Sequence, residues 1–101
     1  MISIIFMTPQ EIQKEIASRV RERRLELNLS QQSLSSRSGV SYGSLKKFEQ
    51  TGKISLESLL KLAVILGRTE DFKTLFAPAP AIAAKSLDEL MKDDKRKRGR
   101  K

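Results

Sequence analysis

The sequence predicts an all-α fold, and three observations carry that prediction. At four places a Ser or Thr stands between two apolar residues five positions apart, which is typical of a helix N-cap with a hydrophobic staple. Glycines follow two of the periodic segments and supply the left-handed residue that ends a helix. No stretch of residues 8–76 alternates with the period of two that a half-buried strand requires. The caps are Thr8, Ser30, Ser41 and Ser55, and the stops are Gly39 and Gly67.

The first helix is expected over 9–27, because Thr8 is followed by a proline and then by Glu11 in a capping box. Apolar side chains recur every four residues along it, and the next step lands on Arg24. An Arg on a buried stripe needs a partner, since an unpaired buried charge is very costly. Glu49 is expected on the inward face of the third helix, so we predict an Arg24–Glu49 ion pair.

The second and third helices are expected over 31–38 and 42–50, joined by the turn Gly39-Val40-Ser41. Two helices with a short glycine-containing turn form the helix-turn-helix pattern. Ser35 is small where the two helices come closest. The apolar face that they share is expected to contain Leu34, Val40, Leu45 and Phe48.

Two further helices complete the expected domain. The fourth follows the Ser55 cap over 56–66, and the fifth starts at Thr69 and covers 70–76. Acidic residues in the first turn of the fifth helix favour its start. Its inward-facing residues are expected to be Phe72, Leu75 and Phe76.

The chain divides into three parts by composition. Residues 8–76 form the expected folded domain, and residues 1–7 (MISIIFM) form an apolar segment without a basic leader or cleavage site, so no signal peptide is expected. This segment either pairs as a strand with its copy in a second protomer or reflects a start codon upstream of Met7. Residues 77–101 combine a Pro/Ala linker, a short helix beginning at Ser86 and a flexible basic tail, in which six of the last seven residues are basic.

Composition narrows the function classes. The 101 residues carry a net charge of +8 and include no His, Cys or Trp. Zinc sites built from Cys or His, thiol chemistry, His-dependent triads and disulfide scaffolds are thereby excluded. We expect no metal, no cofactor and no enzymatic activity, because the sequence offers no His or Cys and no paired carboxylates that could act as nucleophile, base and acid. The charge favours a polyanionic partner inside the cell, with nucleic acid ahead of an anionic membrane surface.

The outer strip of the third helix is the candidate binding surface. It combines two lysines, an aromatic and an amide opposite the apolar face. A lone basic helix of this kind is often only a solvated face. On the second helix of a helix-turn-helix in a +8 chain, DNA reading in the major groove is favoured, with Tyr42, Lys46 and Lys47 at base edges. Gln31 and Gln32 open the second helix, where amides suit phosphate oxygens. The residues of these helices and the following loop expected to face DNA are Gln31, Gln32, Tyr42, Gly43, Ser44, Lys46, Lys47 and Lys53.

Residues 16–76 resemble the lambda-repressor/Cro-like (XRE-type) helix-turn-helix family. The resemblance implies a five-helix domain that binds operator DNA, usually as a two-fold dimer, with Gln31 on phosphate and an Arg24–Glu49 pair. It also implies that the positions Ser41, Tyr42, Gly43 and Lys47 face DNA. Ser35 departs from the family's usual Ala and implies slightly poorer packing, while Gly43 offers no side chain for base readout. The residues that carry the resemblance are Arg24, Leu29, Ser30, Gln31, Leu34, Gly39, Val40, Ser41, Leu45, Glu49, Gly52 and Leu59.

The C-terminal part resembles small regulators encoded beside HipA-type kinases, the HipB-like antitoxins. The segments on which this resemblance rests are Phe76-Ala-Pro-Ala-Pro, Lys85-Ser-Leu-Asp-Glu-Leu and the terminal Arg/Lys run. The resemblance implies a cytoplasmic, nucleoid-associated repressor of its own toxin–antitoxin operon that binds the kinase toxin or its module partner. In some such modules a separate protein neutralises the toxin.

Two alternatives stay open at this point. The same domain also serves phage-type repressors and restriction–modification controllers that have no toxin partner. A different class is a protein–protein adaptor whose helix-turn-helix has lost DNA reading.

Overall fold

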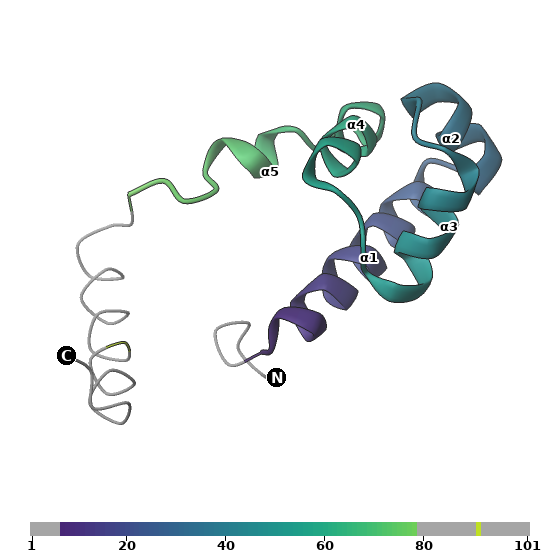
Figure 1. Cartoon of the computed structure of the whole chain (residues 1–101). Helices are drawn as coiled ribbons and strands as arrows, with labels where there is room; N and C mark the ends of the chain where they lie inside the picture. The colour runs from purple at the N-terminus through teal and green to yellow at the C-terminus, as the bar shows by residue number, and fades with distance from the viewer. Residues whose placement is uncertain (1–6, 79–90, 92–101) are drawn as a thin grey trace.

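A computed structural model describes residues 7–78 and Met91, and within these residues the chain is helical with no strand. The all-α prediction is therefore confirmed (Figure 1). Among the described residues, no helix combines the length and apolar character needed to cross a membrane. The expected N-terminal pairing strand lies almost entirely outside the described residues, as do most of the linker, short helix and basic tail. The helices are α1 (Pro9–Glu26), α2 (Gln31–Ser38), α3 (Tyr42–Thr51), α4 (Leu56–Leu66) and α5 (Glu70–Lys73).

The hydroxyl caps start four of these helices, as the sequence predicts. Each cap side chain accepts a hydrogen bond from the backbone N–H three residues later, at Thr8, Ser30, Ser41 and Ser55. The reciprocal bond from the Thr8 N–H to Glu11 Oε1 measures 2.8 Å and completes the capping box. The caps satisfy backbone donors that the first turn of a helix leaves without a partner.

Left-handed glycines end α2, α3 and α4. Gly39 and Gly67 have φ of 82° and 69°, which confirms the two predicted stops. Gly52, with φ of 84°, is a further stop that the sequence reasoning did not identify, and it extends α3 to Thr51. An L side chain is unfavourable in this backbone region, so glycine fits each position.

The turn between α2 and α3 is held by serine hydroxyls. The Ser35 hydroxyl donates to the Val40 carbonyl at 2.6 Å, and the Val40 N–H donates to Ser38 Oγ at 3.1 Å. At Ser35 we expected only a slightly poorer fit than that of alanine. Its hydroxyl instead closes the turn with a hydrogen bond, which fixes the angle at which α3 leaves α2.

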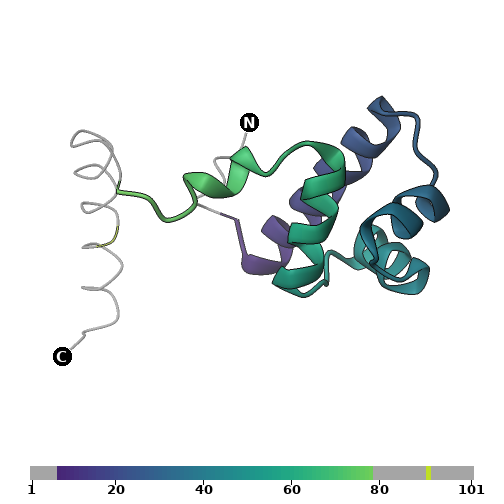
Figure 2. The same ribbon diagram turned by 90° about the horizontal axis from the view of Figure 1, so that it is seen from above.

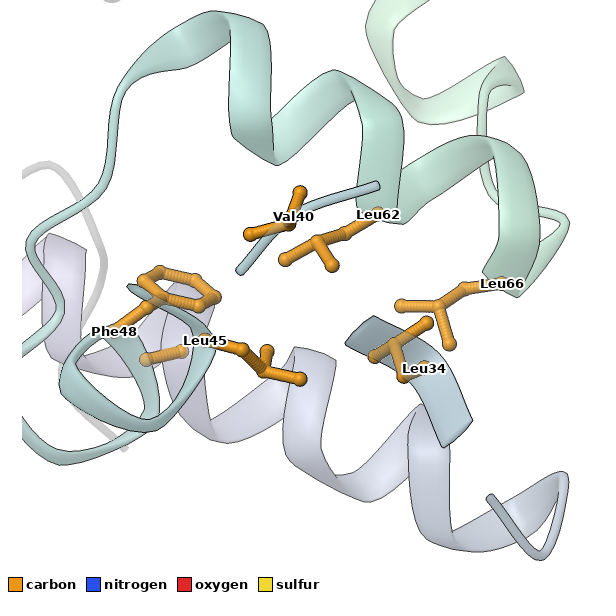
Figure 3. Close-up of a cluster of buried hydrophobic side chains, with 7 residues drawn as sticks. Leu34, Val40, Leu45, Phe48, Leu62 and Leu66 are labelled. Atoms are coloured by element: carbon orange, nitrogen blue, oxygen red, sulfur yellow. The ribbon is translucent and has the colours of Figure 1, made fainter. Parts of the chain in front are cut away.

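One apolar cluster holds the helices together. Leucines of α2 and α4 gather in one cluster with the α3 side chains Leu45 and Phe48 (Figure 3). Ala17 of α1 belongs to the same cluster, with Ile16 and Val20 packed against it. α3 packs against α1 and α2, and α4 packs against α2. The inner face of α3 is thereby buried, and its outer face is presented to solvent.

The predicted Arg24–Glu49 ion pair is confirmed. Arg24 Nε lies 2.8 Å from Glu49 Oε2, and the two side chains are 8% and 4% exposed. The Arg24 Nη1 also donates to the Leu29 carbonyl at 2.8 Å. α1 is thus fixed against α3 by a buried, fully paired charge, as the stripe on the first helix required.

The fifth helix is shorter than the expected span 70–76. The inward position predicted for Leu75 and Phe76 is wrong, whereas Phe72 is half-buried. α5 ends at Lys73; Leu75 is 54% exposed, and Phe76 is 98% exposed with a positive φ of 60°. Thr69 makes no side-chain cap hydrogen bond, so the helix begins weakly. Pro78 disfavours helical backbone at the residue before it. In both views α5 lies beyond the end of α4, away from α2 and α3 (Figure 1 and Figure 2).

Candidate nucleic-acid interface

The two faces of α3 differ as the sequence predicts. Leu45 and Phe48 are buried in the core at 0% and 1% exposure. The other face is exposed along its whole length and carries Tyr42, Gly43, Lys46, Lys47 and Gln50. This outer face of α3 is what the helix-turn-helix presents to a partner.

An aromatic and a cation sit together near the start of this face. Lys46 Nζ lies 5.9 Å from the centre of the Tyr42 ring, and Tyr42 is 40% exposed. A cation–π contact at an exposed site contributes about 0.5–1 kcal/mol. The contact favours one arrangement of two long side chains and so lowers the entropy cost of ordering them on a partner.

Gly43 faces open space. A Cβ added there would meet no other atom of the chain within 4 Å. Its helical position has no positive φ either, so neither packing nor backbone geometry requires a glycine. The missing side chain leaves the first turn of α3 open to close approach by another molecule.

Two serines at the start of α3 are bonded to each other. Ser41 Oγ accepts a hydrogen bond from the Ser44 N–H at 3.1 Å. The Ser41 hydroxyl also donates a hydrogen bond to Ser44 Oγ at 2.8 Å. Both residues are exposed. The capping serine and its neighbour therefore form one small polar unit at the positive end of the helix, where an anion is favoured.

A basic hollow of about 360 Å³ continues from α3 onto the start of α4. Lys47 comes from α3 and Lys53 from the following loop, so two elements contribute its cations. The Thr51 hydroxyl donates to the Lys47 carbonyl at 2.8 Å and accepts from the Lys53 N–H at 3.1 Å. The hollow is lined by Ser44, Lys47, Lys53, Ile54, Ser55 and Ser58.

Sequence reasoning identified three of these lining residues and missed the rest. The sequence predicts that Ser44, Lys47 and Lys53 face DNA, and it predicts only a capping role for Ser55. Ser58 lies one turn after Ser55, and that spacing was the available signal. Thr51 does not line the hollow. Its hydroxyl bond to the Lys47 carbonyl is an ordinary bond back along the helix, and the bond that it accepts from the Lys53 N–H spans the left-handed Gly52.

Gln31 and Gln32 differ in their surroundings. Gln32 is exposed, whereas Gln31 is half-buried and its amide Nε2 donates to Glu49 Oε1 at 2.9 Å. The Gln31 side chain is thus attached to the buried Arg24–Glu49 pair. A side-chain amide has two N–H donors and an acceptor oxygen, so this bond leaves chemical capacity for a phosphate contact.

These features define a class of protein, a helix-turn-helix domain whose second helix has an exposed polar and basic face. A helix-turn-helix family model matches residues 20–73, which is just over half of the 101-residue chain. The chain belongs to this family, the XRE-type or lambda-repressor/Cro-like helix-turn-helix proteins. Members bind double-stranded DNA, and the protein is a DNA-binding transcriptional regulator. No curated protein matches the sequence.

Proposed function

We propose that the protein is a sequence-specific, dimeric repressor that controls its own operon. The observation that carries the proposal is the exposed outer face of α3, with its lysines and aromatic, in a family whose members bind DNA. A helix whose outer face only contacts solvent requires neither the cation–π contact between Tyr42 and Lys46 nor the adjoining basic hollow.

The proposed mechanism places α3 in the major groove. Lysines reach guanine O6 and N7, which are acceptors on the base edge, and Tyr42 offers a hydroxyl and a ring beside them. Ser41 and Gly43 lie where the helix start meets the groove and allow close approach of the backbone. The basic hollow around Lys47 and Lys53 receives a phosphate of the flanking strand. Gln31 and Gln32 contact the phosphates on the other side of the groove.

The proposed biological setting is a HipA-type kinase toxin–antitoxin module. The resemblance of the segments after Leu75 to HipB-like antitoxins supports this setting. The regulator would act in the cytoplasm at the nucleoid, bound to its operator and to the kinase toxin or its module partner. A purified kinase encoded beside this gene should then slow the operator complex further in a gel shift.

DNA reading is tested by a salt titration of binding to the duplex upstream of the gene, with a scrambled duplex of equal length as control. A dimer that neutralises ~6–8 phosphates should give a log–log slope of roughly −5 to −7. Preference for the upstream duplex by about a thousandfold supports a specific autoregulator. Equal binding of both duplexes would mean that the basic charge dominates, and no binding would favour an adaptor.

A variant series locates the reading face. Tyr42→Ala combined with Lys47→Ala should abolish specific binding, because both side chains are exposed on the outer face of α3. Lys73→Ala is the matched control, since it removes one exposed lysine from α5. Lys53→Ala should weaken binding to all sequences alike and reduce the salt slope by about one per protomer. If Lys73→Ala weakens binding as much as the double variant, α3 is not the reading helix.

A further inference from the structure

α4 is apolar on both of its sides. Its inner side chains Leu62 and Leu66 are buried in the core at 0% and 2% exposure. On the outside, Leu56, Leu60 and Val64 recur every four residues and are 62%, 38% and 62% exposed. Surface helices ordinarily turn polar residues to solvent, and a helix that is hydrophobic all round is ordinarily buried.

The outer residues form a continuous surface. Leu56, Leu60 and Val64 line a shallow hollow of about 440 Å³ together with Glu57 and Lys61. We call this surface the α4 stripe. Three apolar side chains in one row make an exposed patch, and such patches mark sites of association.

We infer that the α4 stripe binds the same stripe of a second copy of this chain, with the two α4 helices antiparallel about a two-fold axis beside Leu60. The inference rests on the proposed dimeric repressor and names the surface that makes the dimer. In this arrangement Leu60 meets the partner's Leu60, and Leu56 meets the partner's Val64. A two-fold interface uses one patch twice, so the patch must complement itself.

The charges beside the stripe satisfy that requirement. Glu57 and Lys61 flank it one turn apart, with Lys61 Nζ 3.6 Å from Glu57 Oε2 in the free chain. An antiparallel pairing brings Glu57 near the partner's Lys61 at both ends of the interface, which is attractive. A parallel two-fold pairing would place the two Glu57–Lys61 flanks on opposite sides of the interface, where this attraction is absent. Two chains of net charge +8 repel each other, so a locally neutral, apolar surface is where two copies can meet.

The stripe also lies where a DNA-binding dimer needs its axis. Ser55 and Ser58 line the basic hollow with Lys47 of α3, and Leu56 directly follows Ser55. The stripe therefore begins beside the proposed DNA-facing surface. An axis through the stripe sets two such surfaces side by side, as two half-sites on one face of a duplex require.

Sedimentation velocity of the full chain over a range of concentrations tests the inference. Leu60→Glu puts two carboxylates at the axis and should weaken the dimer by ~100-fold, since facing like charges cost several kcal/mol. Leu25→Glu is the matched control, because Leu25 is a comparably exposed leucine on α1. Circular dichroism confirms that each variant is folded. A monomeric wild-type chain, or a Leu60→Glu dimer as tight as wild type, would overturn the inference.

A charge-swap series tests the antiparallel arrangement independently. Glu57→Lys alone and Lys61→Glu alone should each weaken the dimer, because each sets like charges against the partner. The double swap Glu57→Lys with Lys61→Glu should restore it, and failure of that rescue contradicts the pairing. The readouts also separate this inference from the proposed function. A wild-type chain that dimerises but does not bind DNA specifically would refute the proposed repressor function. A Leu60→Glu variant that binds DNA and dimerises as tightly as wild type would refute the α4 stripe as the dimer interface.

Discussion

The Arg24 guanidinium contacts the Glu49 carboxylate through two parallel hydrogen bonds, Nε to Oε2 at 2.8 Å and Nη2 to Oε1 at 2.9 Å. The same carboxylate accepts the Gln31 amide at 2.9 Å, and Arg24 Nη1 donates to the Leu29 carbonyl. One buried pair therefore joins α1, the start of α2 and the inner face of α3. It fixes the angle from which α3 faces its partner.

Removal of Glu49 should cost much of the stability of the domain. Glu49→Ala leaves the Arg24 charge buried without a carboxylate, and such a loss costs about 3–5 kcal/mol. Urea unfolding followed by circular dichroism measures the change in the free energy of unfolding. The double variant Arg24→Met with Glu49→Leu should be less destabilised than Glu49→Ala, because it leaves no buried charge.

The control for that series is an exposed ion pair within α1, the helix that carries Arg24. Arg19 and Glu15 bond at 3.1 Å with side chains 65% and 41% exposed. Arg19→Ala should change the free energy of unfolding by less than about 1 kcal/mol. A loss at Arg19 equal to that at Glu49 would show that burial does not set the strength of these pairs.

Gly52 and Gly39 make a matched test of close packing. Both have a left-handed backbone, with φ of 84° and 82°. A Cβ at Gly52 would lie 2.8 Å from the Gln13 carbonyl carbon and 2.9 Å from the Lys14 nitrogen, whereas a Cβ at Gly39 meets nothing within 4 Å. The two positions share the conformational cost of an L residue and differ in the clash with α1.

Gly39→Ala should therefore cost about 1–2 kcal/mol, the usual penalty of a left-handed L residue. Gly52→Ala should cost about 1–3 kcal/mol more, because the backbone of α1 must move to admit the methyl group. Thermal and urea unfolding of both variants measure the difference. Equal losses would mean that α1 shifts freely, contrary to the close crossing of α1 and α3.

Arg23 links α1 to the C-terminal end of α4. Its Nε donates to the Leu66 carbonyl at 2.9 Å, at the helix end where a cation is favoured. Arg23→Ala removes that bond and should cost about 1–2 kcal/mol in urea unfolding. Arg23→Lys keeps the charge but not the guanidinium geometry and should lose less than Arg23→Ala. Equal stability of all three proteins would show that the bond contributes nothing.

The sequence predicted features that rest on local rules. Hydroxyl caps, glycine stops and the apolar stripe ending at Arg24 each follow from residues a few positions apart. Gln31 escaped full prediction because nothing in its own sequence surroundings indicates a bond to Glu49 of another helix, whereas Arg24 stood out as a charge on an apolar stripe. The basic hollow escaped for the same reason, since Ser58 approaches Lys47 only after α3 and α4 are placed. Phe76 was expected to face inward on periodicity alone, but that helix has only one turn.

Gly43 offers a prediction in which stability and DNA affinity change in opposite directions. The fold has room for a methyl group there, and alanine favours a helix over glycine by roughly 0.5–1 kcal/mol. Gly43→Ala should therefore stabilise the free domain in urea unfolding. If the backbone of α3 closely approaches the DNA at its first turn, as we propose, the methyl group must lower affinity for the upstream duplex. A paired measurement of unfolding and of fluorescence anisotropy decides the matter: a stabilised variant with undiminished affinity would show that DNA does not approach α3 at Gly43.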